Sequence, residues 1–288
     1  MASAFQTALF ALLLTAAAGA GPAFAQTAAQ AAVPAAPGPE AVDASLSPEC
    51  RVPGSKLYTL APLRSVKRAL KESRAIHVLA IGSSSTVGIG ATSPASAYPV
   101  RLEGELEKLF PGIEIEVTNR GLSGEIAAGA AERIRNTIAE VEPDLVIWQV
   151  GTNDALARVD IDSFAQGLDE TIKWIQSHRI DVVLVDPQYT ASLARDDYYG
   201  RIVKTIQEVA RRDRVPLVLR YEAMRWLASQ KGSGMLARDQ FHLNDLGYRC
   251  MAEHVARAIT LAVVEPEQTG ASGAGASATG SASATPGQ

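Results

Sequence analysis

Cysteine is scarce in this 288-residue sequence, which contains only Cys50 and Cys250. A metal site built from clustered cysteines is therefore excluded. The two cysteines lie at opposite ends of the central region. In an exported chain, where disulfides persist, an even pair predicts one disulfide between them. The alternative is two free thiols.

A strong charge of either sign is also lacking, since the formal net charge is −4. Such a balance gives no indication of a nucleic-acid partner, which would call for a basic stripe or patch. The segment with Lys67, Arg68, Lys71 and Arg74 is locally basic. We interpret it as the solvated face of a helix.

The first 25 residues contain no charged side chain at all. Residues 8–20 form an apolar run, and Ala23-Phe24-Ala25 is an A-x-A cleavage signal. The run is too short for an ordinary membrane-spanning helix. We predict that residues 1–25 are a signal peptide and that the protein is exported, periplasmic or secreted, without stable membrane insertion after cleavage. A retained anchor is the alternative, because the usual Lys or Arg of the n-region is missing.

Large apolar residues are rare in two further segments. Residues 26–49 are rich in Ala and Pro and have no helical or strand periodicity, so they are predicted to be a linker. Residues 265–288 are mostly Gly, Ser, Ala and Thr and are predicted to be a disordered tail. Residues 50–264 remain, which is the size of one α/β domain.

In that domain, apolar runs alternate with amphipathic segments. The predicted strands are 76–81, 113–117, 144–150, 181–185 and 216–219. The predicted helices are 60–73, 97–110, 125–140, 163–177, 199–212, 222–229 and 246–263. Strands that alternate with helices of this length are typical of βαβ units around a parallel sheet.

Three predicted strands are followed by Gly and small polar residues: Gly82-Ser83-Ser84-Ser85, Ser123-Gly124 and Gly151-Thr152-Asn153. Parallel strands end at one edge of the sheet, where ligands bind, so these residues are expected to converge. Ser84 offers a hydroxyl, while the Gly124 N–H and the Asn153 amide can donate hydrogen bonds to an oxyanion. The alternative is an ordinary polar loop with a helix-capping serine. A phosphate-binding loop is disfavoured, because the Walker lysine and the G-x-G-x-x-G spacing are both missing.

The four histidines differ in their surroundings. His77 lies inside a strand, His178 ends a helix, and His254 lies in mid-helix. His242 precedes the last helix, with Asp239 three residues earlier, so that a carboxylate can turn back to the imidazole. The alternative for this segment is a polar helix lead-in with Asn244 as N-cap.

Four blocks in order resemble the GDSL or SGNH family of serine hydrolases: residues 82–88, 119–124, 151–154 and 239–242. The resemblance implies a three-layer α/β/α fold, flavodoxin-like, with a five-stranded parallel sheet. It implies Ser84 as nucleophile, His242 as base and Asp239 as its orienting carboxylate. The implied oxyanion hole consists of Gly124, Asn153 and the Ser84 N–H, with no metal or cofactor. Ser83 departs from the pattern, which has Asp at that position, and so does Arg120-Gly121 within the second block.

From this resemblance we expect an exported serine esterase that hydrolyses carboxylic esters through an acyl-enzyme. Short acyl or O-acetyl esters on a small molecule or a polysaccharide, or a small lipid ester, are the expected substrates. Two alternatives stay open: a non-catalytic carbohydrate-binding protein of the same fold, and an acyltransferase.

Overall fold

Apolar strands form the centre of the structure, a computed structural model that describes residues 41–230 and 234–265. The predicted signal peptide, the linker as far as residue 40 and the tail from residue 266 lie outside the described residues. The sheet has the order β1-β6-β5-β4-β2-β3. Its five parallel strands are β2 (Ile76–Gly82), β3 (Ile115–Gly121), β4 (Leu145–Gln149), β5 (Asp181–Val185) and β6 (Leu217–Val218).

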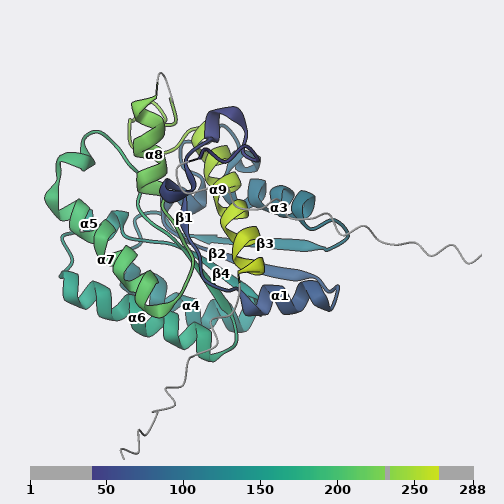
Figure 1. The fold of residues 1–288 in the computed structure, drawn as a ribbon. Coiled ribbons are helices and arrows are strands. Elements are labelled where there is room, and N and C mark those ends of the chain that lie inside the picture. Colours follow the sequence, from purple (N-terminus) through teal and green to yellow (C-terminus); the bar gives the residue numbers. More distant parts are fainter. Residues whose placement is uncertain (1–40, 231–233, 266–288) are drawn as a thin grey trace, which may run out of the picture. The chain divides into compact units, whose positions relative to one another are not determined.

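Helices cover both faces of this sheet, as Figure 1 shows. Along β2, Val78 and Ala80 face one apolar core while Leu79 and Ile81 face the other, as the two-residue period of a strand requires. The first core contains side chains from α1 (Arg64–Lys71), α3 (Tyr98–Leu109), α8 (Arg220–Ser229) and α9 (Asp245–Val264). The second contains side chains from α4 (Ala127–Val141), α6 (Ile161–Ser177) and α7 (Asp197–Asp213). The predicted three-layer α/β/α architecture is confirmed.

The sheet has one strand more than predicted. A two-residue strand, β1 (Tyr58–Thr59), pairs antiparallel with β6 and covers the outer edge of the sheet. The Leu219 N–H donates to the Leu57 carbonyl and extends this pairing by one bond. A strand of two residues has no alternation of polar and apolar side chains that a sequence pattern could register. The expectation of a purely five-stranded parallel sheet was therefore incomplete.

The folded region begins earlier than the predicted boundary at residue 50. Asp43 and Leu46 are buried, and Val42 forms an isolated bridge with Pro53. The Asp43 carboxylate accepts a hydrogen bond of 2.6 Å from the Nε of Arg257 on α9, and both side chains are less than 5% exposed. A buried guanidinium requires such a counter-ion. The end of the predicted linker therefore belongs to the domain.

Helix α1 begins four residues later than the pattern predicts. The carboxylate of Asp181, at the start of β5, accepts the backbone N–H groups of Arg64, Ser65 and Val66. These are unsatisfied donors of the first helical turn, which prefer a negative charge. A capping residue 116 positions away from Ser65 explains why the local sequence misplaced the helix start.

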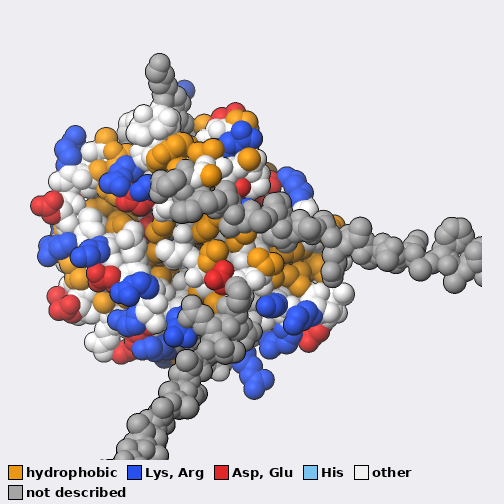
Figure 2. Space-filling view, viewed as in Figure 1, with side chains coloured by type: hydrophobic (Ala, Val, Ile, Leu, Met, Phe, Trp, Pro, Cys, Tyr) orange, Lys and Arg blue, Asp and Glu red, His pale blue; other side chains and the backbone are white. Residues whose placement is uncertain are grey.

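Charged side chains of both signs are spread over the face seen in Figure 2, in keeping with the small net charge. Within the described residues, no helix has the length and apolar character needed to cross a membrane.

A disulfide joins Cys50 to Cys250 in the first turns of α9, with the two Cα atoms 5.0 Å apart. Next to it, the backbone N–H and the hydroxyl of Ser47 donate to the carboxylate of Glu253, one turn further along α9. These contacts fix the N-terminal end of the domain to the helix that follows His242.

We therefore expect the unfolded, unreduced protein to contain no titratable thiol. The bridge closes a loop of 200 residues, which corresponds to on the order of 5 kcal/mol in the chain-entropy model of disulfide stabilisation. Thiol titration in denaturant, with and without reductant, measures the thiols directly, and a non-reducing gel should show a monomer. Two free thiols before reduction would rule the bridge out.

Candidate active site

Ser84 lies where strand β2 meets a short helix. Strand β2 ends at Gly82, and α2 (Ser84–Val87) begins two residues later. Of the three consecutive serines, Ser83 and Ser85 are buried, whereas Ser84 is half-buried. The Ser83 N–H and hydroxyl both donate to the side-chain oxygen of Gln149, which ends β4. The fold therefore leaves Ser84 as the serine of this turn that can meet a substrate.

His242 and Asp239 complete a hydrogen-bonded chain with Ser84. His242 Nε2 lies 3.0 Å from the Ser84 Oγ, and His242 Nδ1 lies 2.6 Å from an oxygen of Asp239. The same carboxylate accepts the backbone N–H groups of Phe241 and His242, each at 3.0 Å. The hydrogen bond from His242 lowers the pKa of Asp239 to about 2, so this carboxylate is ionised at neutral pH.

The loops that carry Ser84 and His242 touch at Gly90. A Cβ on Gly90 would lie 2.4 Å from the Leu243 carbonyl and 3.1 Å from the His242 Cβ. The backbone at Gly90 has a φ of +95°, which L-residues with side chains rarely adopt. Glycine here allows the imidazole to reach the serine across 158 positions of sequence.

The predicted oxyanion donors lie on two adjoining loops. Asn153 is in α5 (Thr152–Leu156), directly after β4, and its amide donates one N–H to the Glu125 carbonyl at 2.8 Å. A carboxamide has a second N–H, which remains for a ligand. Gly124 is exposed with a φ of +80°, and a Cβ there would meet nothing within 4 Å. A ligand can therefore approach the backbone at Gly124.

Two further contacts hold these loops together and next to Ser84. The buried carboxylate of Asp154 accepts the N–H groups of Ala127 at 2.8 Å and Gly151 at 3.2 Å. The Leu122 N–H donates to the carbonyl of Gly82, two residues before Ser84. All three predicted strand ends thus meet in one place, as their position in a parallel sheet requires.

The other histidines lie elsewhere. His77 is partly exposed and lies 3.2 Å from Glu116. The His178 ring contacts Trp174 at the end of α6. His254 is buried with Nε2 2.7 Å from the Cys50 carbonyl, and burial lowers its pKa to about 4. His242 is the histidine that contacts Ser84. Asn244 also caps α9, accepting the Gly247 N–H at 3.0 Å, so both interpretations of that segment hold.

Sequence reasoning did not single out Gln149 or Gln188 as parts of the site. Gln149 supports the Ser83 turn, and Gln188 accepts a 2.8 Å hydrogen bond from the Thr152 hydroxyl beside Asn153. Both are uncharged residues in buried positions, where a sequence pattern gives no signal for them. Gln188 lies in the connection from β5 to α7, and its buried side chain supports the turn at Thr152.

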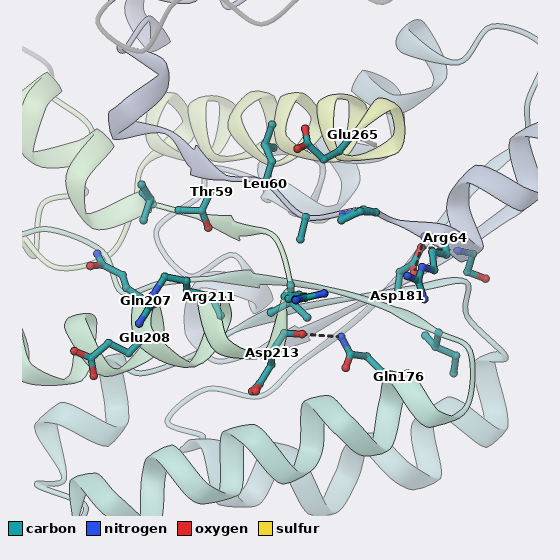
Figure 3. Close-up of a pocket in the computed structure, with 18 of the residues that line it drawn as sticks. Thr59, Leu60, Arg64, Gln176, Asp181, Gln207, Glu208, Arg211, Asp213 and Glu265 are labelled. Carbon is teal, nitrogen blue, oxygen red and sulfur yellow. Dashed lines mark hydrogen bonds between the residues drawn. The ribbon is translucent and has the colours of Figure 1, made fainter. Parts of the chain in front are cut away.

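A cavity of about 1260 Å³ is lined by other residues, some of which Figure 3 shows. Its walls include Arg64, Asp181, Arg211 and Asp213, which lie near the starts of β5 and β6 and at α7. Neither Ser84, Asp239 nor His242 lines this cavity, whose walls extend along the β1 and β6 side of the sheet and include Thr59, Leu219 and Glu222. Among the described residues, no three His, Cys, Asp or Glu side chains are grouped so that they could hold a metal ion.

Comparisons with known proteins give the family. The model of the non-GDSL lipase-like family matches residues 49–265. An acetylxylan esterase of Geobacillus stearothermophilus is 26% identical over 129 residues, which are 39% of this chain and 59% of that enzyme. The chain therefore spans less than two thirds of this relative.

Solved structures give the fold. A two-domain esterase active on acetylated mannans has a TM-score of 0.62 and 19% identity, covering 74% of this chain and 57% of the other. TesA has a TM-score of 0.56 and 21% identity, covering 65% of this chain and 99% of its own. Because the family match spans nearly all of the folded region, including the strand ends and the loop of His242, this chain belongs to the non-GDSL lipase-like family.

Proposed function

We propose that this protein is a serine esterase that hydrolyses carboxylic esters. The observation that carries the proposal is the chain from Asp239 through His242 to Ser84, with distances of 2.6 and 3.0 Å. His242 takes the proton from Ser84 as its Oγ attacks the ester carbonyl, then returns it to the leaving alcohol. Water activated by His242 cleaves the acyl-enzyme. The ionised Asp239 holds the imidazole in orientation and stabilises its charged form.

We assign three hydrogen-bond donors to the stabilisation of the negative charge on the tetrahedral intermediate. These are the Ser84 N–H at the start of α2, the Gly124 N–H and the free N–H of the Asn153 amide. Donors that are fixed before the reaction need no reorganisation as the charge develops. The contacts of Asn153 with Glu125 and of Asp154 with Ala127 support such a fixed arrangement.

Esters of acetyl or other short acyl groups on carbohydrates are the substrates we propose. Support comes from the relatives, an acetylxylan esterase and an esterase active on acetylated mannans. We also propose that the protein is exported to the periplasm or secreted, since residues 1–25 have the features of a signal peptide. A polysaccharide substrate and a persistent disulfide both suit that location.

The test is a panel of p-nitrophenyl esters from acetate to long acyl chains, together with acetylated xylan and acetylated mannan. Release of acetate from the polysaccharides, and highest kcat/KM on the shortest p-nitrophenyl esters, are the expected results. Labelling by a fluorophosphonate without turnover of any ester would favour an acyltransferase, to be checked by adding an acceptor alcohol. No labelling and no turnover would favour the carbohydrate-binding alternative.

Asn153→Ala should lower kcat for ester hydrolysis by about 10²–10³-fold, the effect of losing one oxyanion donor. KM should change little, since the donor acts mainly on the charge of the transition state. Steady-state kinetics on p-nitrophenyl acetate measures both constants, and circular dichroism checks that the fold persists. A raised KM with unchanged kcat would mean that Asn153 only binds substrate.

A further inference from the structure

The loop that carries Gly124 has an exposed tip. Leu122, Ser123 and Gly124 are all exposed, and Leu122 is 53% exposed despite its apolar side chain. Within the tip, the Glu125 N–H closes a turn by donating to the Leu122 carbonyl. A backbone N–H that stabilises an oxyanion must keep its direction to a fraction of an ångström. The direction of the Gly124 N–H therefore depends on how the two ends of the tip are held.

Arg133 contacts both ends. It lies on α4, and its Nε and Nη2 donate to the two carboxylate oxygens of Glu125 at 2.8 and 2.6 Å. Nη2 also donates to the Arg120 carbonyl at 2.9 Å, at the end of β3. One guanidinium thus connects Arg120, two residues before the tip, with Glu125, the residue directly after it.

The contact continues to the second predicted donor. The carbonyl of Glu125, whose carboxylate Arg133 binds, accepts the Asn153 amide at 2.8 Å. The Glu125 side chain is 5% exposed and that of Arg133 is 29% exposed, so the ion pair is largely shielded from water. A shielded, two-point Arg–carboxylate pair has a defined geometry that an exposed pair lacks.

We propose that Arg133 is a positioning residue that sets the oxyanion hole through Glu125 and Asn153, an inference that rests on the proposed ester hydrolysis. It touches no substrate. It holds residues 120 and 125 at a fixed separation, so the Gly124 N–H and the Asn153 amide are aimed at the same point. Arginine is required because its planar fork supplies two parallel donors to a carboxylate together with a third to a carbonyl. Lysine is a point charge and cannot make the same set of bonds.

Arg133→Met keeps the length and the apolar stem and removes the donors. The expected result is a fall of about ten- to hundredfold in kcat on p-nitrophenyl acetate with KM nearly unchanged. Arg133→Lys should recover only a small part of the loss. Arg135→Met is the matched control, since it removes the same charge from the same helix and its guanidinium lies 5.4 Å from the Trp174 ring, away from the loop. It should keep the wild-type kcat.

Two measurements separate positioning from general loss of structure. In Arg133→Ala, millimolar guanidinium should restore part of kcat, while it should not affect Arg135→Ala. Glu125→Gln, Arg133→Met and the double variant should lose similar factors, because each breaks the same contact. For every variant, kcat is calculated from the concentration of active sites, which is measured by labelling with a fluorophosphonate to completion.

The inference is overturned if Arg133→Met has the same kcat as Arg135→Met. It is also overturned if the fall in kcat of Arg133→Met disappears when kcat is calculated per labelled active site. Additive losses in Glu125→Gln and Arg133→Met would overturn it as well. Failure of the proposed function is a separate result, because wild-type protein would then hydrolyse no ester at all.

Discussion

Replacing Ser84, the proposed nucleophile, by alanine is expected to reduce ester hydrolysis by on the order of 10⁶-fold in kcat, as loss of the nucleophile does in serine hydrolases. Neither neighbouring serine can take its place, because Ser83 and Ser85 are buried and the Ser83 hydroxyl is bound to Gln149. Residual turnover would come from the oxyanion donors and from binding alone. The measurement is steady-state hydrolysis of p-nitrophenyl acetate at enzyme concentrations high enough to detect this residual turnover.

Ser85→Ala is the matched control, since it removes the same hydroxyl one position further along α2. It should retain activity within about tenfold, as a substitution that leaves the hydrogen-bonded chain in place. Ser84→Ala should also fail to react with a fluorophosphonate, whereas Ser85→Ala should label fully. A fully active Ser84→Ala would refute the mechanism, whatever the control shows.

Much of the fold and the site could be predicted because the signals are local. Val78, Leu79, Ala80 and Ile81 form an apolar run that can only be a buried strand or a buried helix, and Gly82 ends it. Once three such runs end in small polar residues, the geometry of a parallel sheet brings Ser84, Gly124 and Asn153 to one edge. The resemblance to serine hydrolases then supplied their roles.

What could not be predicted depends on contacts between distant residues. The start of α1 is set by Asp181, the counter-ion of Arg257 is Asp43, and β1 exists because β6 has a free edge. In each case the local sequence is compatible with several structures, and the partner that decides among them lies far along the chain. Short segments such as α2 and α5 have too few residues for a helical period to be seen.

The same limit applies to the residues that support the site. Arg133 lies on a helix with the spacing of an ordinary solvated face, and nothing in its neighbours points to Glu125. Gln149 looks like one polar residue at the end of an apolar strand. Their contacts with the loops of Gly124 and Ser83 exist only once α4, β3 and β4 are assembled. A family motif identifies the groups expected to react, whereas the side chains that hold these groups in position become visible only in the structure.

His242→Ala is expected to cost about as much as Ser84→Ala, on the order of 10⁶-fold in kcat, because a nucleophile and its base, the roles proposed for these two residues, act as one unit. His178→Ala is the control, since this imidazole lies beside Trp174 at the end of α6 and has no contact with Ser84. It should keep the wild-type rate. An inactive His178→Ala beside an active His242→Ala would overturn the assignment of the base.

The pH dependence tests the same residue in the unaltered protein. Only a neutral imidazole can accept the Ser84 proton, so the acid side of the kcat/KM profile should report the base that contacts Ser84. Asp239 cannot cause the fall on that side, because its bond with His242 lowers its pKa to about 2 and it stays ionised down to that pH. Nor can His254, which is buried and whose ring contacts the Cys50 carbonyl. The acid limb should therefore be unchanged in His254→Gln, which can still donate to the same carbonyl. A limb that moved in His254→Gln would show that the titrating base is a different histidine from the one in contact with Ser84.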